Sequence, residues 1–257
     1  MPFLDEILAS THKRIADSKA KVTAEVLEQR LASAPPARDF SSALSGKDFS
    51  IIGEIKRATP SAGVLAEQLN AGQTAAAYAR GGAAAISVLT EPEFFRGSLD
   101  DIDAALPAGP PVLRKDFVVD EWQLLETRAA GADAVLLIVR IVGEELGNLF
   151  RSARAVGLQA LVEVYDEEDL DRAISAGAEV IGINSRDLDT FEVDPDRTAR
   201  LAPQVPGGVV VIGLSGVTTR AEIKELDSSG AHGALVGEAL VTAADPEAKL
   251  RELRGES

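Results

Sequence analysis

Glu54 and Lys56 are the first residues whose types and spacing could do chemistry. They lie two positions apart in the otherwise apolar run 51–56, so on a strand both side chains point to the same face. Charges on a buried strand face cost free energy unless they pair or react. A loop rich in Thr, Pro, Ser and Gly follows at 57–63. This stretch alone fits a buried salt bridge as well as it fits one side of an active site.

Later apolar runs also end in polar residues. These further candidates are Lys115, Glu163, Asn184 and Arg186. Lysines and carboxylates that converge with an amide and a guanidinium could perform general acid–base catalysis. Neighbouring lysines lower each other's pKa and a close carboxylate raises it, so the sequence does not assign protonation states. Arg114 and Asp116 flank Lys115 with the opposite side-chain direction, so we expect them to form outward, structural pairs.

Small residues follow the last two apolar runs, at 213–217 and 237–239. Glycine-containing turns let backbone N–H groups approach an anion, and α/β barrels often bind phosphate at these two places. The sequence therefore favours a phosphorylated small-molecule substrate.

These candidates must be positioned by a regular series of strands and helices. The apolar runs cover residues 51–56, 85–89, 112–115, 134–138, 160–164, 180–184, 209–212 and 234–237. Helix-like stretches lie between them, for example at 65–81, 121–130, 143–156, 167–176 and 219–229. Gly-Ala pairs precede several runs, and glycine is the usual residue at a helix C-terminus. Eight such units predict an α/β fold, a closed parallel (β/α)8 TIM barrel. An open doubly wound sheet is the alternative, but no G-x-G-x-x-G follows the first run.

The chain before the first run is helical in pattern. Apolar residues recur at helical spacing across residues 2–33, which predicts one or two amphipathic helices, and the prolines at 35 and 36 end them. No linker divides the remainder. We expect one domain over 1–257, with an N-terminal helical extension at 1–48 and the barrel at 49–257.

Composition excludes several classes of function. The net charge of −15 disfavours binding to nucleic acid. The chain has no cysteine and two histidines, so we expect no disulfide, no thiolate catalysis and no cysteine-ligated or histidine-rich metal site. We interpret Asp100, Asp101 and Asp103 as a solvated helix start. No membrane-length apolar run and no secretory signal are apparent, so we expect a cytoplasmic protein without membrane partners. We also expect a monomer.

Ordered motifs along the whole chain resemble one family, indole-3-glycerol phosphate synthase. They are Ile52-Gly-Glu-Ile-Lys-Arg-Ala-Thr-Pro-Ser-Ala-Gly63, Ser87-Val-Leu-Thr-Glu91, Phe95-Arg-Gly-Ser98, Pro111-Val-Leu-Arg-Lys-Asp-Phe117, Gly131-Ala-Asp-Ala-Val-Leu-Leu-Ile138, Leu161-Val-Glu-Val164, Gly182-Ile-Asn-Ser-Arg-Asp-Leu188 and Leu235-Val-Gly237. The resemblance implies a lyase of tryptophan biosynthesis that needs no metal or organic cofactor. Its reaction closes 1-(2-carboxyphenylamino)-1-deoxyribulose 5-phosphate to indole-3-glycerol phosphate, with loss of carbon dioxide and water.

The resemblance also implies roles for individual residues. Lys115 would be the general acid that protonates the substrate carbonyl, Glu163 and Lys56 would share the later proton transfers, and Glu54 would hold the lysines electrostatically. Asn184 and Arg186 would position a substrate hydroxyl and the anthranilate carboxylate. The aromatic ring would lie against Phe95, Phe117 and Leu136. The phosphate would lie among Thr59, Ser215, Gly216, Gly237 and Glu238.

One departure from the family pattern falls inside the expected pocket. The family usually has Ser/Ala-Glu-Ser-Gly-Ile where this chain has Gly213-Leu-Ser-Gly-Val217, so Leu214 replaces a glutamate. That glutamate points toward the substrate amine and ring, and a leucine cannot accept a hydrogen bond there. Gly53 for alanine and Thr59 for serine are smaller departures.

Three interpretations follow. The first is a working synthase with retuned activity. The second is a diverged paralogue that acts on a related aminodeoxypentulose phosphate, which the change to Leu214 motivates. The third is a non-catalytic or engineered phosphate-binding barrel. The presence of Lys56, Lys115, Glu163, Asn184 and Arg186 argues against the third, because an inactive site need not keep all five.

Overall fold

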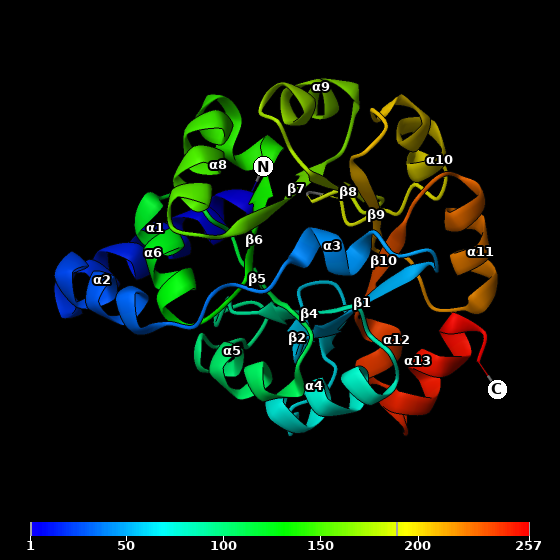
Figure 1. The fold of residues 1–257 in the computed structure, drawn as a ribbon, viewed down its shortest axis with the longest axis horizontal. Helices are drawn as coiled ribbons and strands as arrows, with labels where there is room; N and C mark the ends of the chain where they lie inside the picture. Colours follow the sequence, from blue (N-terminus) through cyan, green and yellow to red (C-terminus); the bar gives the residue numbers. More distant parts are fainter. Residues whose placement is uncertain (1, 189, 257) are drawn as a thin grey trace.

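A closed parallel barrel forms the centre of the molecule (Figure 1). The computed structural model describes residues 2–188 and 190–256, and in this part of the chain eight strands close in the order β1-β10-β9-β8-β7-β6-β5-β4. The barrel strands are β1 Ser50–Ile55, β4 Ala85–Leu89, β5 Val112–Lys115, β6 Ala134–Ile138, β7 Gln159–Val164, β8 Val180–Asn184, β9 Val210–Leu214 and β10 Gly233–Val236. The predicted (β/α)8 TIM barrel is confirmed.

Helices surround the strands and precede them. The helices before and within the barrel are α1 Pro2–Lys21, α2 Ala24–Ser33, α3 Phe40–Leu44, α4 Ala71–Arg80, α5 Asp100–Ala105, α6 Glu121–Ala129, α7 Val139–Val142, α8 Leu146–Ala155, α9 Glu167–Ser175, α10 Arg197–Leu201, α11 Arg220–Ser228, α12 Glu238–Val241 and α13 Pro246–Arg254. Short 3-10 turns lie at Leu106–Ala108, Gly143–Glu145 and Ala202–Gln204. A small antiparallel hairpin, β2 Ala58–Thr59 with β3 Gly63–Val64, follows β1.

Successive side chains of each strand alternate between the inside of the barrel and the layer between the strands and the helices. Inward residues such as Ile52, Leu113, Leu161 and Ile212 form one apolar cluster inside the barrel. Their outward neighbours pack under the helices in two further clusters. Because strands buried on both faces need apolar residues at nearly every position, the strands read as continuous apolar runs in the sequence.

Glycines end four of the helices as expected. Gly82, Gly131, Gly177 and Gly230 have φ between 81° and 91°. Only glycine adopts this left-handed conformation without a steric cost, so each can turn the chain from a helix into the next strand.

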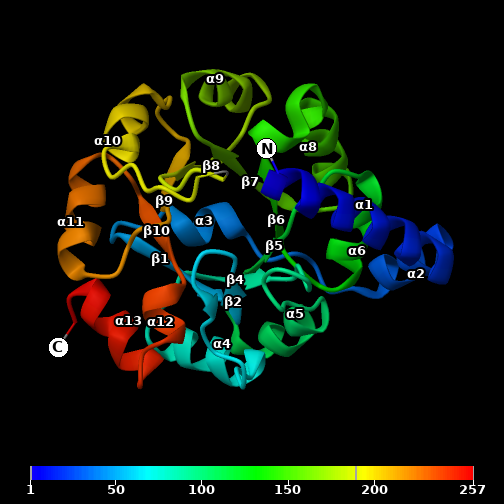
Figure 2. The same ribbon diagram turned by 180° about the vertical axis from the view of Figure 1, so that it is seen from behind.

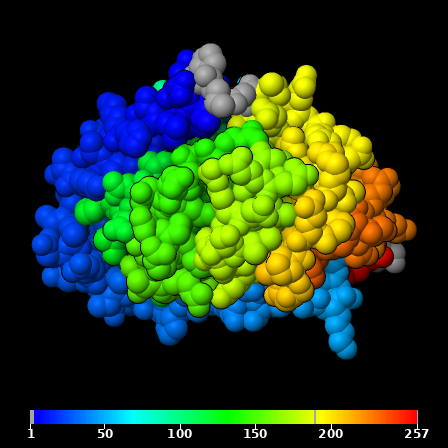
Figure 3. All heavy atoms as spheres, turned by 90° about the horizontal axis from the view of Figure 1, so that it is seen from above, coloured from blue at the N-terminus to red at the C-terminus, as the bar shows by residue number. Residues whose placement is uncertain are grey.

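The N-terminal extension packs against both ends of the barrel. Phe40 and Leu44 of α3 are fully buried in the cluster inside the barrel, and α3 lies across its middle in Figure 1. Figure 2 shows α1 and α2 beside α6. Ile15, Leu27 and Trp122 form a small apolar cluster between these helices. The blue N-terminal segment accordingly lies directly against the green segment on the surface in Figure 3.

Three local predictions need correction. The stretch 65–81 is helical only from Ala71, because Asn70 caps the helix there by accepting a hydrogen bond from the Gln73 backbone N–H. Strand β9 continues through Leu214, where we expected the loop to begin at 213. Asp101 is buried and paired with Arg57 at 2.5 Å, so it is not solvated.

No helix in residues 2–188 and 190–256 is long and apolar enough to cross a membrane.

Candidate active site

A cavity of about 340 Å³ opens at the C-terminal ends of the barrel strands. All of the sequence-predicted site residues line it. They are Glu54, Lys56, Thr59, Phe95, Lys115, Phe117, Leu136, Glu163, Asn184, Arg186, Leu214, Ser215, Gly216, Gly237 and Glu238. The barrel geometry brings them together because most of them lie near the C-terminal end of a strand or in the loop that follows it. Their individual roles stay predictions.

On one side of the cavity, Lys56 and Lys115 both pair with the carboxylate of Glu54. Glu54 Oε1 lies 2.8 Å from Lys56 Nζ, and Glu54 Oε2 lies 3.5 Å from Lys115 Nζ. Burial alone would raise the pKa of Glu54, but the two lysines outweigh it and hold that pKa below its ordinary value. Burial alone would lower the pKa of Lys115, but Glu54 and Glu163 outweigh it and raise that pKa. Lys115 is therefore a protonated ammonium that can act as an acid.

The opposite side of the cavity holds a second carboxylate in a hydrogen-bond network. Asn184 Nδ2 donates to Glu163 Oε1 at 2.9 Å, and the Tyr165 hydroxyl donates to the same oxygen. Asn184 Oδ1 in turn accepts from Ser215 Oγ at 2.8 Å and from the Arg186 backbone N–H at 3.0 Å. Asn184 thus links strands β7 and β9 to the loop that carries Arg186.

An apolar surface completes the cavity between the two carboxylates. The rings of Phe95 and Phe117 are tilted and 6.2 Å apart. Leu136 and Leu214 are each 2% exposed and belong to the cluster inside the barrel. An aromatic ring could lie against this surface, because aromatic and aliphatic side chains bury such rings favourably.

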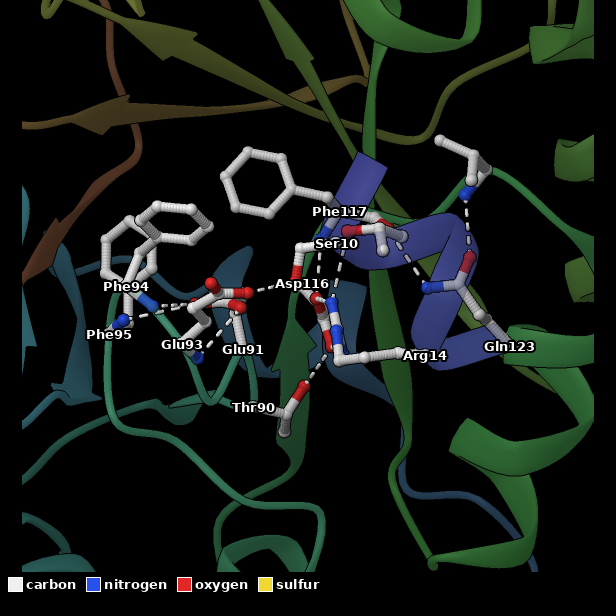
Figure 4. Close-up of polar contacts among 12 residues, drawn as sticks. Ser10, Arg14, Thr90, Glu91, Glu93, Phe94, Phe95, Asp116, Phe117 and Gln123 are labelled. Carbon is white, nitrogen blue, oxygen red and sulfur yellow. Dashed lines mark hydrogen bonds and ion pairs between the residues drawn. The ribbon is translucent and has the colours of Figure 1, made fainter. Parts of the chain in front are cut away.

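Glu91 organises the loop that presents Phe95, as Figure 4 shows. Its Oε2 accepts hydrogen bonds from the backbone N–H groups of Phe94 and Phe95 at 2.7 and 3.1 Å, and its Oε1 accepts from Glu93 N. Glu91 is fully buried. Buried carboxylates that accept several backbone donors fix a loop firmly. No role for Glu91 was predicted from the sequence.

The first helix also contributes to the cavity, which the sequence analysis missed. Phe3, Leu4 and Ile7 of α1 line it. Phe3 makes edge-on ring contacts with Phe94 and Phe191, with centroids 5.3 and 5.1 Å apart. The spacing of these apolar residues indicates a buried helix face, but nothing in a helical pattern says what that face packs against.

Two side-chain contacts attach α1 to the barrel beside the cavity (Figure 4). Arg14 donates to both oxygens of Asp116, at 2.9 and 3.3 Å, and Ser10 donates to Glu93 at 2.5 Å. Asp116 also pairs with Arg114, which is 1% exposed. The outward direction predicted for Arg114 and Asp116 is confirmed, and Asp116 additionally anchors α1.

Small residues form the remaining end of the cavity. Ser215 and Gly216 have φ of 68° and 82°, so the chain turns sharply after β9. A Cβ atom at Gly237 would lie 2.4 Å from Glu54 Oε1 and 3.0 Å from Lys56 Nζ. Glycine at 237 therefore leaves space for the Glu54–Lys56 pair, and with Thr59 and Glu238 this end could enclose a phosphate group.

Arg186 is held near the cavity by its own loop. Its guanidinium donates to the Phe191 carbonyl at 2.9 Å, and Arg186 pairs with Val193 in an isolated bridge. The next residue, Asp187, forms an ion pair with Arg140 at 3.2 Å. A partly buried guanidinium fixed in this way could bind a substrate carboxylate.

Comparison with known proteins agrees with this geometry. The family model described as indole-3-glycerol phosphate synthase matches residues 4–253. A protein of Streptomyces coelicolor named indole-3-glycerol phosphate synthase 1 is 44% identical over 255 residues, which cover 98% of this chain and 95% of the relative. The indole-3-glycerol phosphate synthase of Mycobacterium tuberculosis strain H37Rv is 44% identical over 252 residues, which cover 97% and 93%.

Solved structures of more distant proteins share the fold. A 3-hexulose-6-phosphate synthase aligns with a TM-score of 0.64 at 20% identity, over 80% of this chain and 99% of that one. A thiamine phosphate pyrophosphorylase from Pyrococcus furiosus aligns with a TM-score of 0.62 at 18% identity, over 84% and 96%. At these identities the likeness concerns the barrel fold alone.

Proposed function

This chain belongs to the indole-3-glycerol phosphate synthase family, and from that premise we propose which of its residues perform the family's reaction. The substrate is 1-(2-carboxyphenylamino)-1-deoxyribulose 5-phosphate, and the product is indole-3-glycerol phosphate. The enzyme is a carbon–carbon lyase, because ring closure is accompanied by loss of the carboxylate as carbon dioxide.

Lys115 begins the reaction as a general acid. The aromatic carbon that bears the carboxylate attacks the substrate carbonyl carbon, and Lys115 gives its proton to the carbonyl oxygen. Carbon dioxide then leaves, and its bonding electrons restore the aromatic ring. The observation that carries this assignment is the position of Lys115 in the cavity with its Nζ 3.5 Å from Glu54 Oε2, because this carboxylate stabilises the ammonium form that holds the proton.

Glu163 and Lys56 complete the reaction by dehydration. Glu163 removes the proton from the carbon next to the nitrogen, and Lys56 protonates the departing hydroxyl, which leaves as water. Glu54 lies between the two lysines and forms an ion pair with each of them.

The rest of the cavity positions the substrate. Arg186 binds the anthranilate carboxylate and Asn184 a hydroxyl group, while Phe95, Phe117 and Leu136 bury the ring. The phosphate lies among Thr59, Ser215, Gly216, Gly237 and Glu238. We propose that the protein acts as a monomer in the cytoplasm and needs no cofactor. Its binding partner is the phosphorylated substrate, and it binds neither nucleic acid nor a membrane.

Indole fluorescence tests the proposal directly. The wild-type chain supplied with the substrate is expected to generate indole, and Lys115→Ala is expected to lower kcat by a factor of at least ~100, the usual contribution of a general acid. The matched control is Lys13→Ala, which removes an exposed lysine of α1 that pairs with Asp17. Absence of indole formation by the wild type, with substrate still bound, would overturn the proposal and favour a related aminodeoxypentulose phosphate.

A further inference from the structure

The two oxygens of the Glu163 carboxylate have different surroundings. Oε1 accepts hydrogen bonds from the Tyr165 hydroxyl and from Asn184 Nδ2. Oε2 is buried and has no hydrogen-bond partner among the described residues. Glu163 lines the cavity, and Oε2 is the oxygen of its carboxylate whose hydrogen-bonding capacity is unused.

Tyr165 is built into the barrel as a hydrogen-bond donor. It is 3% exposed and follows Glu163 by two residues, so both side chains point into the barrel. Burial and the negative charge of Glu163 raise the pKa of Tyr165 well above its ordinary value, so the phenol stays protonated. Its oxygen accepts a hydrogen bond from Asn184 Nδ2 at 3.0 Å, which leaves the phenolic proton for Glu163.

Two arginines hold the tyrosine ring in place. The guanidinium of Arg140 lies 4.4 Å from the ring centroid, and that of Arg197 lies 5.9 Å from it. Arg140 is itself held by Asp166 and Asp187, and Arg197 donates to the Asn184 carbonyl at 2.6 Å. The Tyr165 ring cannot turn its hydroxyl away from Glu163 without disturbing these contacts.

We infer that Tyr165 is a positioning residue for Glu163, which binds Oε1 and leaves Oε2 as the oxygen that exchanges protons with the substrate. This inference rests on the proposed function of Glu163 in dehydration. Packing alone would require only the ring of Tyr165. The hydroxyl adds a direct contact with the carboxylate, and a donor to an ionised carboxylate favours its charged form.

The charged groups near Tyr165 and Glu163 come from several elements. Lys115 of β5 faces Glu163 and pairs with Glu54 of β1. Arg140 and Arg197 face Tyr165 from α7 and α10, and Asp166, Asp169 and Asp187 lie around Arg140. A substitution that removes only the Tyr165 hydroxyl leaves all of these charges unchanged, so its effect on the pH–rate profile reports on that hydroxyl.

Tyr165→Phe is the first test. It keeps the ring and its contacts with the arginines but loses the donor to Glu163. We expect kcat to fall about tenfold with a smaller change in KM, and the acid limb of the pH profile of kcat to move to higher pH. Tyr78→Phe is the control, because it removes the chain's other tyrosine hydroxyl, which is buried and donates to the Glu54 backbone carbonyl at 3.1 Å. The control should lower Tm and leave the acid limb unchanged.

Replacement of Tyr165 by 3-fluorotyrosine should move the acid limb of the pH profile in the opposite direction. In the Tyr78→Phe background Tyr165 is the only tyrosine, so 3-fluorotyrosine supplied during expression labels this position alone. Its phenol is more acidic and donates more strongly, so the acid limb should move to lower pH. Identical pH profiles for the Phe, fluorotyrosine and wild-type proteins would overturn the inference. Absence of indole formation by the wild type would instead overturn the proposed function, so the two failures are distinguishable.

Discussion

The side chain of Leu214 occupies the space over Gly182, so that a Cβ atom at position 182 would come within 2.7 Å of Leu214 Cδ1. The two residues lie on the neighbouring strands β8 and β9, and Leu214 is paired in register with Asn184. Position 214 is therefore enclosed by backbone and adjacent to the network that holds Glu163. An acidic residue there would lie close to the substrate and away from water.

Leu214→Glu is expected to raise kcat. A carboxylate at this position could bind the substrate amine, and one charge-assisted hydrogen bond of about 1.5–3 kcal/mol corresponds to about tenfold or more in rate. The same change should lower Tm, because the site is 2% exposed. Steady-state kinetics and thermal unfolding measure both effects. Leu214→Gln is the control of equal shape without charge, and a Glu variant no faster than wild type would mean that other residues already compensate.

Gly53→Ala is expected to destabilise the barrel, although alanine is usual here in the family. A Cβ atom at Gly53 would lie 2.5 Å from Tyr78 Cδ2, so the ring must move. Such overpacking costs about 1–3 kcal/mol in the free energy of unfolding. Gly46→Ala is the matched control, because a Cβ atom there meets nothing within 4 Å.

Denaturant unfolding of a double variant tests the cause of that loss. Combining Gly53→Ala with Tyr78→Leu removes the ring atoms that clash, so the two substitutions should destabilise less together than the sum of their separate effects. Strict additivity would show that the Tyr78 ring is not the obstacle.

Asp116 should make stability depend on acid pH. Burial alone would raise its pKa, but Arg114, Arg14 and Thr90 outweigh burial and lower that pKa from 3.8 to about 2. A lowered carboxyl pKa contributes stability that is fully present above pH 3.8 and is lost as the pH falls toward about 2. The shift corresponds to about 2 kcal/mol.

Asp116→Asn removes this contribution and leaves two arginines less well compensated. We expect the free energy of unfolding at pH 7 to fall by about 3 kcal/mol. Between pH 4 and pH 2, the variant should lose less of its free energy of unfolding than the wild type does. Urea unfolding across that range is the measurement. The control is Asp17→Asn, an exposed pair with Lys13. Equal effects of the two substitutions would contradict the assignment.

Phe3→Ala should weaken substrate binding more than turnover. Phe3 lines the cavity and contacts Phe94 and Phe191, but it carries no group that exchanges protons. We therefore expect KM to rise about fivefold with kcat nearly unchanged, as for loss of uniform binding. Phe3→Leu, which keeps apolar volume, should lie between the alanine variant and wild type. A fall in kcat with KM unchanged would show that α1 acts on the chemical step instead.

The strand pattern explains why so much of the site could be predicted. Glu54, Lys115 and Glu163 each share a direction with apolar neighbours two residues away, and parallel strands in a barrel bring such residues to one end. The family and its lyase function, predicted from the ordered motifs, are confirmed by the relatives and by the family model. Oligomeric state and the separate roles of the lysines stay predictions.

The residues that the sequence analysis missed depend on contacts between distant segments. Phe3 could be assigned to an apolar helix face, but its position at the cavity depends on how α1 packs on α6. Asp101 resembled a solvated helix start, because its partner Arg57 lies 44 residues earlier. Tyr165 did have a local signal, since it follows Glu163 by two residues and strand alternation directs both side chains inward.

Strand β5 separates two kinds of function by side-chain direction. Lys115 faces the cavity, whereas Arg114 and Asp116 face a charge network that connects α1 and α6 to the barrel. The side chain that enters the cavity from β5 is therefore distinct from the side chains that attach this strand to α1 and α6. A strand arranged in this way gives the protein room to acquire new substrates by mutation while its backbone stays in place.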